Sequence, residues 1–405
     1  VPGSTTTETY RTEFEYDAVN RMKKQTLIDR TSGTNTKVTE WKRGAIGLRR
    51  TVDPLGNEVT FTLDGLGRTT QKHEDMGSGA AIVTTWEHDD ADHVTKLTDD
   101  NGSDTLYAYD VHGRLSVKTY ESTKTVTYTY DDNGNVVEVE DQNGTLIAQG
   151  YDDLDRLIGR DITPASGVGG DTTEDFAYDA LGRLTQAQDD DSTVQMTYDS
   201  LSRVLTEVQG GNPLGTTGKT VSYAWDAEGN RTQVAYPSGF EANEARDELG
   251  RLTQIEDGAS ATVASFEVYG AGLREKKRTL ANGTCAATSY DGFRRPTAID
   301  HKTSGGTEFA GFDYGWDKND NPLYEARSHT SGKGDVYSYD KANRLTRVLR
   351  DVHDPAAEIA NPGTEAYDKK LEYEMDDVLN LTSYKQTPYG GSTTTTSYTT
   401  DAMNQ

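Results

Sequence analysis

The sequence predicts an all-β protein, a repeat array of antiparallel β-hairpins of about 24 residues each that winds into a spiral ribbon. Three observations carry this prediction. A heptad made of an aromatic residue, an aspartate, a four-residue turn and an aliphatic residue recurs in phase along the chain, as in Tyr178–Leu184. Apolar and polar residues alternate before each heptad, and a period of two is typical of strands. Residues that favour turns stand at fixed places between these strands.

The aromatic position of the heptad recurs 17 times, at intervals mostly of 20–27 residues. It falls at residues 16, 41, 63, 88, 109, 130, 151, 178, 198, 225, 246, 269, 290, 316, 339, 375 and 400. The second position is aspartate in 15 of the 17 heptads, with Lys42 and Gly270 as the exceptions, so we predict a geometric role for this side chain. Because a repeat array grows by stacking its units, residues 1–405 are predicted to form a single continuous array.

Each hairpin is predicted from its own pattern. Val126, Tyr128 and Tyr130 share one face of a strand that ends at the heptad. The fifth heptad position is usually Gly, Asn or Asp, which tolerate the left-handed backbone of a tight turn. A second strand then leaves in the opposite direction, and another turn, such as residues 53–57, leads to the next unit. A lone hairpin is marginal in water, so neighbouring hairpins are expected to pair edge to edge.

Within the heptad, the aromatic and aliphatic positions are predicted to be core, the glycine to reverse the chain, and the aspartate and arginine to brace the turn. Two alternatives stay open: in-phase arginines that bind an anionic glycan, and an aromatic stripe that stacks on sugars. The structural repeat positions are Tyr16, Asp17, Arg21, Tyr109, Asp110, Gly113, Arg114, Tyr130, Asp131, Tyr151, Asp152, Arg156, Tyr178, Asp179, Gly182, Arg183, Tyr198, Asp199, Arg203, Trp225, Asp226, Tyr290, Asp291, Trp316, Asp317, Tyr339, Asp340 and Arg344.

Three stretches depart from the regular spacing. Residues 159–173 and 351–363 are rich in turn-forming residues and are predicted to be surface loops inserted between hairpins. The last heptad begins at residue 400 and stops inside its turn at Gln405. The sequence is therefore expected to be a fragment of a longer polypeptide.

Composition narrows the classes of partner. The net charge is −26 and no basic run is present, which argues against nucleic acid, because binding to phosphates needs clustered Lys and Arg. Hydrophobic residues make up 33% of the chain and 23 residues are Tyr, so the core is expected to be thin and aromatic. Cys285 is the single cysteine, and no apolar run approaches the roughly 20 residues of a membrane span.

Candidate chemical sites coincide with the repeat. Residues 88–93 contain two histidines and three aspartates, the residue types of a metal site, but they occupy heptad positions. Residues 317–321 resemble the start of a calcium loop, yet Pro322 stands where that loop needs glycine. No phosphate-binding loop, nucleophile elbow or isolated carboxylate pair is evident. We predict no enzyme, no metal site and no cofactor.

The repeated heptads resemble the RHS, or YD, repeat family, whose consensus is close to Tyr-Asp-x-x-Gly-Arg-Leu. The resemblance extends from Tyr16 to Gln405. It implies a spiral of β-hairpins that forms a hollow shell or tube, in proteins that are secreted or on the cell surface. In bacterial polymorphic toxins and insecticidal toxin complexes such shells enclose a toxic cargo, and in teneurins a related barrel contributes to adhesion.

The leading functional hypothesis is a structural segment of a large secreted or cell-surface bacterial protein, forming part of a shell that encapsulates a toxin or other cargo. One alternative is an adhesion module that binds a cell-surface glycan or protein. Another is a filament or tube that assembles through open hairpin edges. The expected partners are the remainder of the polypeptide, further copies of the chain, or the enclosed cargo, without nucleic acid and without a membrane span.

Overall fold

The computed structural model describes residues 10–29, 35–77, 80–211, 215–269, 274–376 and 380–399. The chain packs as two compact units, which are described separately. Unit 1 comprises Val1–Asp104 and Glu267–Gln405, and unit 2 comprises Thr105–Phe266. The heptad predicted at residue 400, and Gly270 of the heptad at 269, lie outside the described residues.

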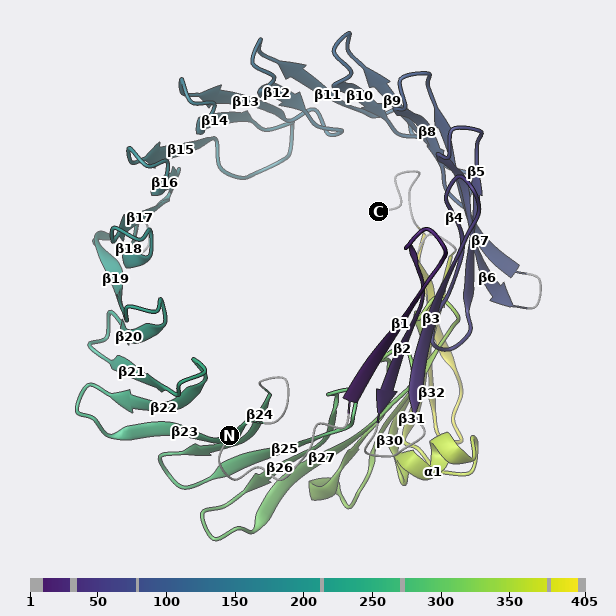
Figure 1. Cartoon of the computed structure of the whole chain (residues 1–405), viewed down its shortest axis with the longest axis vertical. Coiled ribbons are helices and arrows are strands. Elements are labelled where there is room, and N and C mark those ends of the chain that lie inside the picture. The colour runs from purple at the N-terminus through teal and green to yellow at the C-terminus, as the bar shows by residue number, and fades with distance from the viewer. Residues whose placement is uncertain are drawn as a thin grey trace. The chain divides into compact units, whose positions relative to one another are not determined.

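The described residues form 33 strands of one antiparallel sheet, so the predicted all-β hairpin fold is confirmed. Figure 1 shows the strands of each unit following one another hairpin by hairpin. The strands are β1 (Tyr10–Tyr16), β2 (Met22–Asp29), β3 (Thr36–Arg43), β4 (Leu48–Val52), β5 (Glu58–Leu63), β6 (Thr69–Gly77), β7 (Ala80–His88), β8 (Val94–Thr98), β9 (Asp104–Tyr109), β10 (Leu115–Thr119), β11 (Thr125–Tyr130), β12 (Val136–Glu140), β13 (Leu146–Tyr151), β14 (Leu157–Thr163), β15 (Thr173–Tyr178), β16 (Leu184–Asp189), β17 (Ser192–Tyr198), β18 (Val204–Gly211), β19 (Gly215–Trp225), β20 (Arg231–Ala235), β21 (Glu241–Arg246), β22 (Leu252–Asp257), β23 (Thr262–Tyr269), β24 (Glu275–Leu280), β25 (Cys285–Tyr290), β26 (Pro296–Lys302), β27 (Glu308–Trp316), β28 (Pro322–Arg327), β29 (Gly334–Tyr339), β30 (Leu345–Val352), β31 (Lys369–Met375), β32 (Leu381–Pro388) and β33 (Thr394–Ser397).

The register of the hairpins repeats with the sequence. In the hairpin of β15 and β16, Tyr178 lies opposite Leu184, so the first and seventh heptad positions are cross-strand partners. A register shift follows at once, between Ala177 and Tyr178, and the same irregularity occurs at the equivalent place in β11/β12 and β13/β14. Such a bulge inserts one extra residue and increases the local twist. The heptad therefore sets both the turn and the twist of its hairpin.

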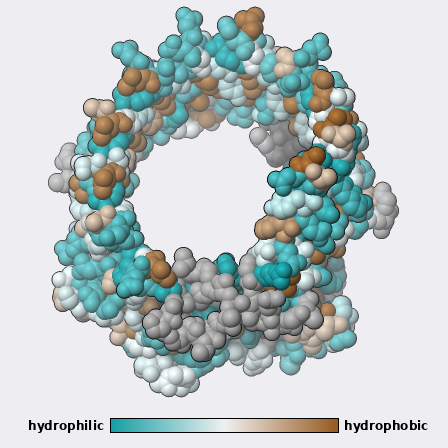
Figure 2. Space-filling model, in the orientation of Figure 1, coloured by the Kyte–Doolittle hydropathy of each residue, from teal (hydrophilic) through white to brown (hydrophobic). Residues whose placement is uncertain are grey.

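Most side chains in the described strands are half-buried. Ten apolar side chains of the described residues are buried: Ile82, Val126, Val234, Ala264, Phe266, Val336, Val348, Leu349, Val352 and Pro355. Figure 2 shows hydrophobic residues scattered in small groups among hydrophilic ones on the visible surface. No helix in the described part of the chain has the length and apolar character needed to cross a membrane.

The insertion at residues 351–363 is more ordered than the surface loop that the sequence predicts. It contains α1 (Pro355–Ala360), which packs against β28 and β29, and the only other helix among the described residues is the short η1 (Ser328–Thr330). Asp354 caps α1 by accepting a hydrogen bond from the Ala357 amide at 2.9 Å. The insertion thus supplies a second layer over one part of the sheet.

A buried cluster forms beneath this insertion. Val336, Leu349 and Val352 make its centre, with Ile359 and Tyr367 packed against it. Glu358 is 2% exposed, and its carboxylate accepts the amides of Gly363 at 2.8 Å and Glu365 at 3.1 Å. The amides of the following loop offset the cost of burying this carboxylate.

Val352→Ala should lower the free energy of unfolding by about 2 kcal/mol, because it leaves a cavity at a fully buried site. The urea midpoint of β-sheet loss measures the effect. Val111→Ala is the matched control, since Val111 is 97% exposed and the same truncation should change little. Equal effects of the two substitutions would contradict this account of the cluster.

Candidate functional site

The repeated heptad turn, which runs from the second to the sixth heptad position, is closed by its aspartate. In Asp179–Arg183, the Asp179 amide donates to the Arg183 carbonyl at 2.9 Å, and the Gly182 amide donates to the Asp179 carbonyl at 3.0 Å. Gly182 has a φ of 79°, in the left-handed region that the sequence predicts for the fifth position. One carboxylate oxygen accepts the amides of Leu181 and Arg183, and the other accepts Arg183 Nε at 2.6 Å. The aspartate therefore pairs two amides of the tight turn and also fixes the arginine side chain.

The same carboxylate contacts recur in turns of both units. Where the sixth position is arginine, the aspartate accepts both its amide and its Nε, in the pairs Asp17–Arg21, Asp64–Arg68, Asp110–Arg114, Asp152–Arg156, Asp199–Arg203, Asp247–Arg251, Asp291–Arg295 and Asp340–Arg344. Where it is asparagine, the side-chain amide takes the place of Nε, in Asp131–Asn135, Asp226–Asn230, Asp317–Asn321 and Asp376–Asn380. The second position is fixed more strictly than the sixth because only an acceptor can serve there.

These contacts favour the charged form of the aspartates. Hydrogen bonds from the Arg114 backbone and side chain lower the pKa of Asp110 to about 2. The pKa of Asp179 is lowered chiefly by the Arg183 side chain and then by its amide. A carboxylate that accepts several N–H groups is stabilised as the anion.

The arginine also reaches the next hairpin. Arg183 Nη1 donates to the carbonyl of Asp199 at 2.8 Å, and its guanidinium carbon lies 4.7 Å from the centre of the Tyr198 ring. Tyr198 Oη donates back to the Leu184 carbonyl at 2.6 Å. Two consecutive heptads are therefore joined by a hydrogen bond in each direction and by a cation–π contact.

This junction is repeated along the array. The arginine donates to the following heptad's aspartate carbonyl in Arg68–Asp89, Arg114–Asp131, Arg156–Asp179, Arg203–Asp226, Arg295–Asp317 and Arg344–Asp376. The aromatic residue donates to a carbonyl of the preceding hairpin in Tyr130–Leu115, Tyr151–Val136, Tyr178–Leu157, Trp225–Val204, Tyr290–Glu275 and Trp316–Pro296. Trp replaces Tyr at this position because its indole N–H can make the same bond.

Other predicted repeat positions differ in exposure. Tyr16, in the first heptad, is half exposed, although Asp17 and Arg21 make the usual turn contacts. Tyr339 lies in β29, and burial raises its pKa.

The left-handed fifth position recurs as well. Gly113 has a φ of 78° and occupies the same position as Gly182.

The two metal candidates of the sequence are engaged in turns. His93 Nδ1 lies 3.0 Å from a carboxylate oxygen of Asp89, in the position that arginine Nε occupies elsewhere. The Asp317 carboxylate accepts the amides of Asn319 and Asn321 and the Asn321 side chain. Cys285 is half-buried in β25, opposite Lys302.

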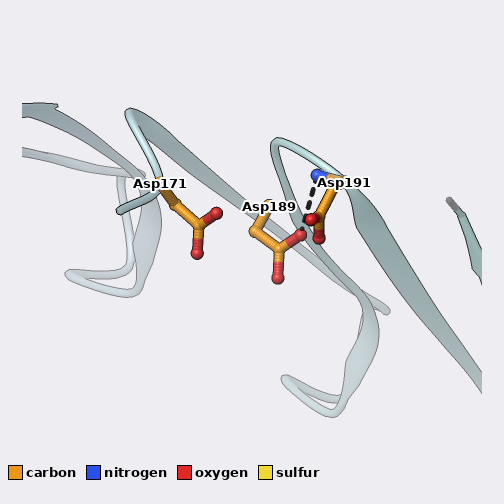
Figure 3. Close-up of side chains that lie close together, drawn as sticks. All are labelled: Asp171, Asp189 and Asp191. Atoms are coloured by element: carbon orange, nitrogen blue, oxygen red, sulfur yellow. Dashed lines mark hydrogen bonds between the residues drawn. The ribbon is translucent and has the colours of Figure 1, made fainter. Parts of the chain in front are cut away.

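The structure brings together a third candidate metal site, made of three aspartates, that the sequence analysis did not single out. Asp171, Asp189 and Asp191 of unit 2 place carboxylate oxygens within 4.8 Å of one another, and Figure 3 shows them converging from two neighbouring loops. Partial desolvation and the neighbouring carboxylates raise the pKa of Asp171. Asp189 is held by the Ser192 hydroxyl and by the amides of Asp191 and Ser192. Such oxygen donors suit a hard cation such as Ca²⁺, although Asp171 and Asp191 are exposed.

Comparison with known protein families finds a match for part of the repeat array. The RHS Repeat family profile matches residues 88–125, 109–145 and 130–168. Residues 88–168 are therefore RHS repeats. A search of curated protein sequences finds no significant match.

The fold of the chain also resembles that of solved structures. The crystal structure of TcdB2–TccC3 aligns over 98% of this chain and 23% of that chain, with a TM-score of 0.77 and 15% identity. The complex TcdB2–TccC3–Cdc42 aligns over 97% of this chain and 22% of that chain, with a TM-score of 0.76 and 15% identity. The Tc holotoxin pore of Photorhabdus luminescens aligns over 98% of this chain and 22% of that chain, with a TM-score of 0.75 and 14% identity. The chain spans about a quarter of the length of these proteins, and the likeness is one of fold.

Arg183→Lys should loosen the junction between consecutive heptads, because the single ammonium of a lysine does not reproduce the planar fork that bonds Asp179 through Nε and the Asp199 carbonyl through Nη1. We expect faster amide hydrogen exchange in the turn at 199–203. Arg160→Lys is the control, since Arg160 pairs with Glu174 on a strand and bonds no heptad turn. Unchanged exchange in Arg183→Lys would refute the bridging role.

Acid should weaken the heptad turns selectively. The pKa of Asp110 is lowered in the folded state. The contribution of its carboxylate to the free energy of unfolding is therefore present above about pH 4 and is lost as the pH falls toward 2. Asp110→Asn should therefore be less stable than the parent at neutral pH, and the difference should shrink in acid. Urea midpoints measured across this range test the prediction, with Asp153→Asn, at an exposed turn position, as the control. A difference that is independent of pH would be inconsistent with it.

Proposed function

We propose that this chain is a structural segment of an RHS-repeat shell in a large secreted bacterial protein, and that the shell encloses a toxin or other cargo. The observation that carries the proposal is the set of heptad junctions that recurs in both units. The arginines of seven heptads donate to the aspartate carbonyl of the next heptad, and these bonds oppose splitting between the hairpins that they join. A wall needs such bonds between neighbouring hairpins.

The fold likeness adds support. The proteins that share this fold include the Tc holotoxin pore and TcdB2–TccC3. The chain spans about a quarter of their length, so a complete enclosure would require more than these residues. The cargo and its release belong to the whole polypeptide.

The adhesion hypothesis gains less support from the side chains. A sugar stacks on an open aromatic face, whereas the Tyr130, Tyr178 and Tyr198 rings each have an arginine 4.4–4.8 Å from the ring centre. Their hydroxyl groups also donate to backbone carbonyls. An aromatic stripe used in this way is structural.

Protease protection of the natural polypeptide that contains this chain tests the enclosure. While the heptad repeats are folded, a segment of that polypeptide outside the repeats should resist cleavage by trypsin. The same segment should become sensitive to cleavage once acid or denaturant has opened the wall. Parallel cryo-electron microscopy should place density for that segment inside the wall. A segment that is cleaved while the RHS repeats stay folded would overturn the proposal.

A further inference from the structure

One hairpin of unit 1, made of β3 and β4, departs from the heptad and reverses the local charge. Its second heptad position is Lys42, where the other described heptads have aspartate. Residues 41–52 contain four cations, Lys42, Arg43, Arg49 and Arg50, and no acidic residue. The sequence shows these cations as two pairs separated by five residues, and the hairpin places Lys42 opposite Arg50. A local charge of +4 therefore stands in a chain whose net charge is −26.

Most of this local charge is not neutralised by ion pairs. Arg50 Nη1 lies 2.7 Å from a carboxylate oxygen of Glu58. Lys42, Arg43 and Arg49 form no ion pair with any residue that the structure describes, and the side chains of Lys42 and Arg43 are exposed. These cations are therefore available to an anionic partner.

The end of this hairpin is apolar. The Gly44 amide donates to the Gly47 carbonyl at 2.8 Å, which leaves Ala45 and Ile46 at the apex. Ala45 is exposed, and Ile46 is 46% exposed. The hairpin thus ends in an apolar apex with cations directly behind it on both strands. We call residues 42–50 the basic tip.

The basic tip is held in place by the next hairpin. A Cβ on Gly47 would lie 2.7 Å from Leu63 Cδ1, and a Cβ on Gly67 would lie 2.8 Å from the Ile46 carbonyl oxygen. The absence of a side chain at these two glycines lets the basic tip pack against the heptad turn at 64–68. The apex is therefore presented on a fixed support.

The neighbouring heptad turn adds apolar surface without adding unpaired negative charge. Leu66, directly before Gly67, is 74% exposed. The Asp64 carboxylate of the same turn is paired with Arg68. Two consecutive hairpin ends thus present exposed aliphatic side chains beside unpaired cations.

This combination fits the surface of an anionic bilayer better than it fits a soluble anion. A soluble phosphate or carboxylate needs only the cations. At a bilayer, an aliphatic apex can also enter the boundary between headgroups and acyl chains while the cations behind it meet lipid phosphates. Leu154 is a contrasting apex, because it is 70% exposed but lies between Asp153 and Asp155, which an anionic surface would repel.

We propose that the basic tip docks unit 1 on a membrane surface rich in anionic phospholipids, with Ile46 and Leu66 entering the boundary between headgroups and acyl chains. The net charge of −26 opposes this approach at long range. At physiological ionic strength, charges more than about 8 Å apart are largely screened, so the contacts of the basic tip outweigh acidic residues that lie further away. The inference does not depend on the enclosure of cargo.

Flotation of the purified chain with vesicles at physiological ionic strength tests the proposal. The chain should float with vesicles that contain phosphatidylglycerol and should not float with vesicles of phosphatidylcholine alone. Lys42→Gln with Arg43→Gln should weaken binding roughly 25-fold, because each cation near an anionic surface contributes about fivefold. The matched control, Lys124→Gln with Lys333→Gln, removes the same net charge from exposed positions elsewhere and should leave binding unchanged. No binding to phosphatidylglycerol, or equal losses in the two double variants, would overturn the proposal.

A fluorescent probe at the apex separates a bilayer from soluble anions. In a Cys285→Ser background, bimane on Ile46→Cys should shift its emission to the blue with phosphatidylglycerol vesicles, whereas bimane on Leu154→Cys should not. Inorganic phosphate and polyglutamate, at matched ionic strength, should neither shift the emission of the Ile46→Cys probe nor release the chain from vesicles. Equal shifts at the two positions, or release by either soluble anion, would refute docking on a bilayer.

Discussion

The structure depends on one charged contact, the bond between the aspartate at the second heptad position and the arginine at the sixth. The aspartate orders the turn by accepting two amides, and its second oxygen fixes Nε of the arginine. A planar guanidinium fixed at one edge can direct its remaining N–H groups only along one path. That path leads to the next hairpin, where the arginine meets a carbonyl and an aromatic ring.

This arrangement explains how a sheet with so few buried side chains is held together. Cross-strand pairs and turn contacts are local, so each hairpin is stabilised by itself and by its immediate neighbours, as in other repeat proteins. The buried cluster under α1 is an exception and belongs to an insertion. At several junctions an arginine lies over the aromatic ring of the next heptad, so polar and apolar contacts occur together there.

Unit 1 adds a second kind of contact to this local one. Hairpins adjacent in sequence are joined by the heptad, whereas Asn319 bonds Asp53 and Lys341 pairs with Asp75, in each case 266 residues apart. The heptad residues that make these contacts, Asn319 and Lys341, vary from heptad to heptad. The constant positions of the heptad build the ribbon, and the variable ones decide what its edges contact.

The sequence by itself determined the hairpin array, the place of each turn and the left-handed fifth position, because these are set by residues within a few positions of one another. It also placed Asp179 beside Arg183, four residues away. Only the tertiary structure decided that Arg183 reaches Asp199, that Asp53 meets Asn319, and that Asp171 approaches Asp189. The repeat marks Arg183 and Asp199 as equivalent positions of successive heptads but does not say that they touch, and no sequence pattern relates the other two pairs. The helix at 355–360 was missed for a similar reason: six residues are too few for a helical period, and it is held by Glu358 and the strands beneath it.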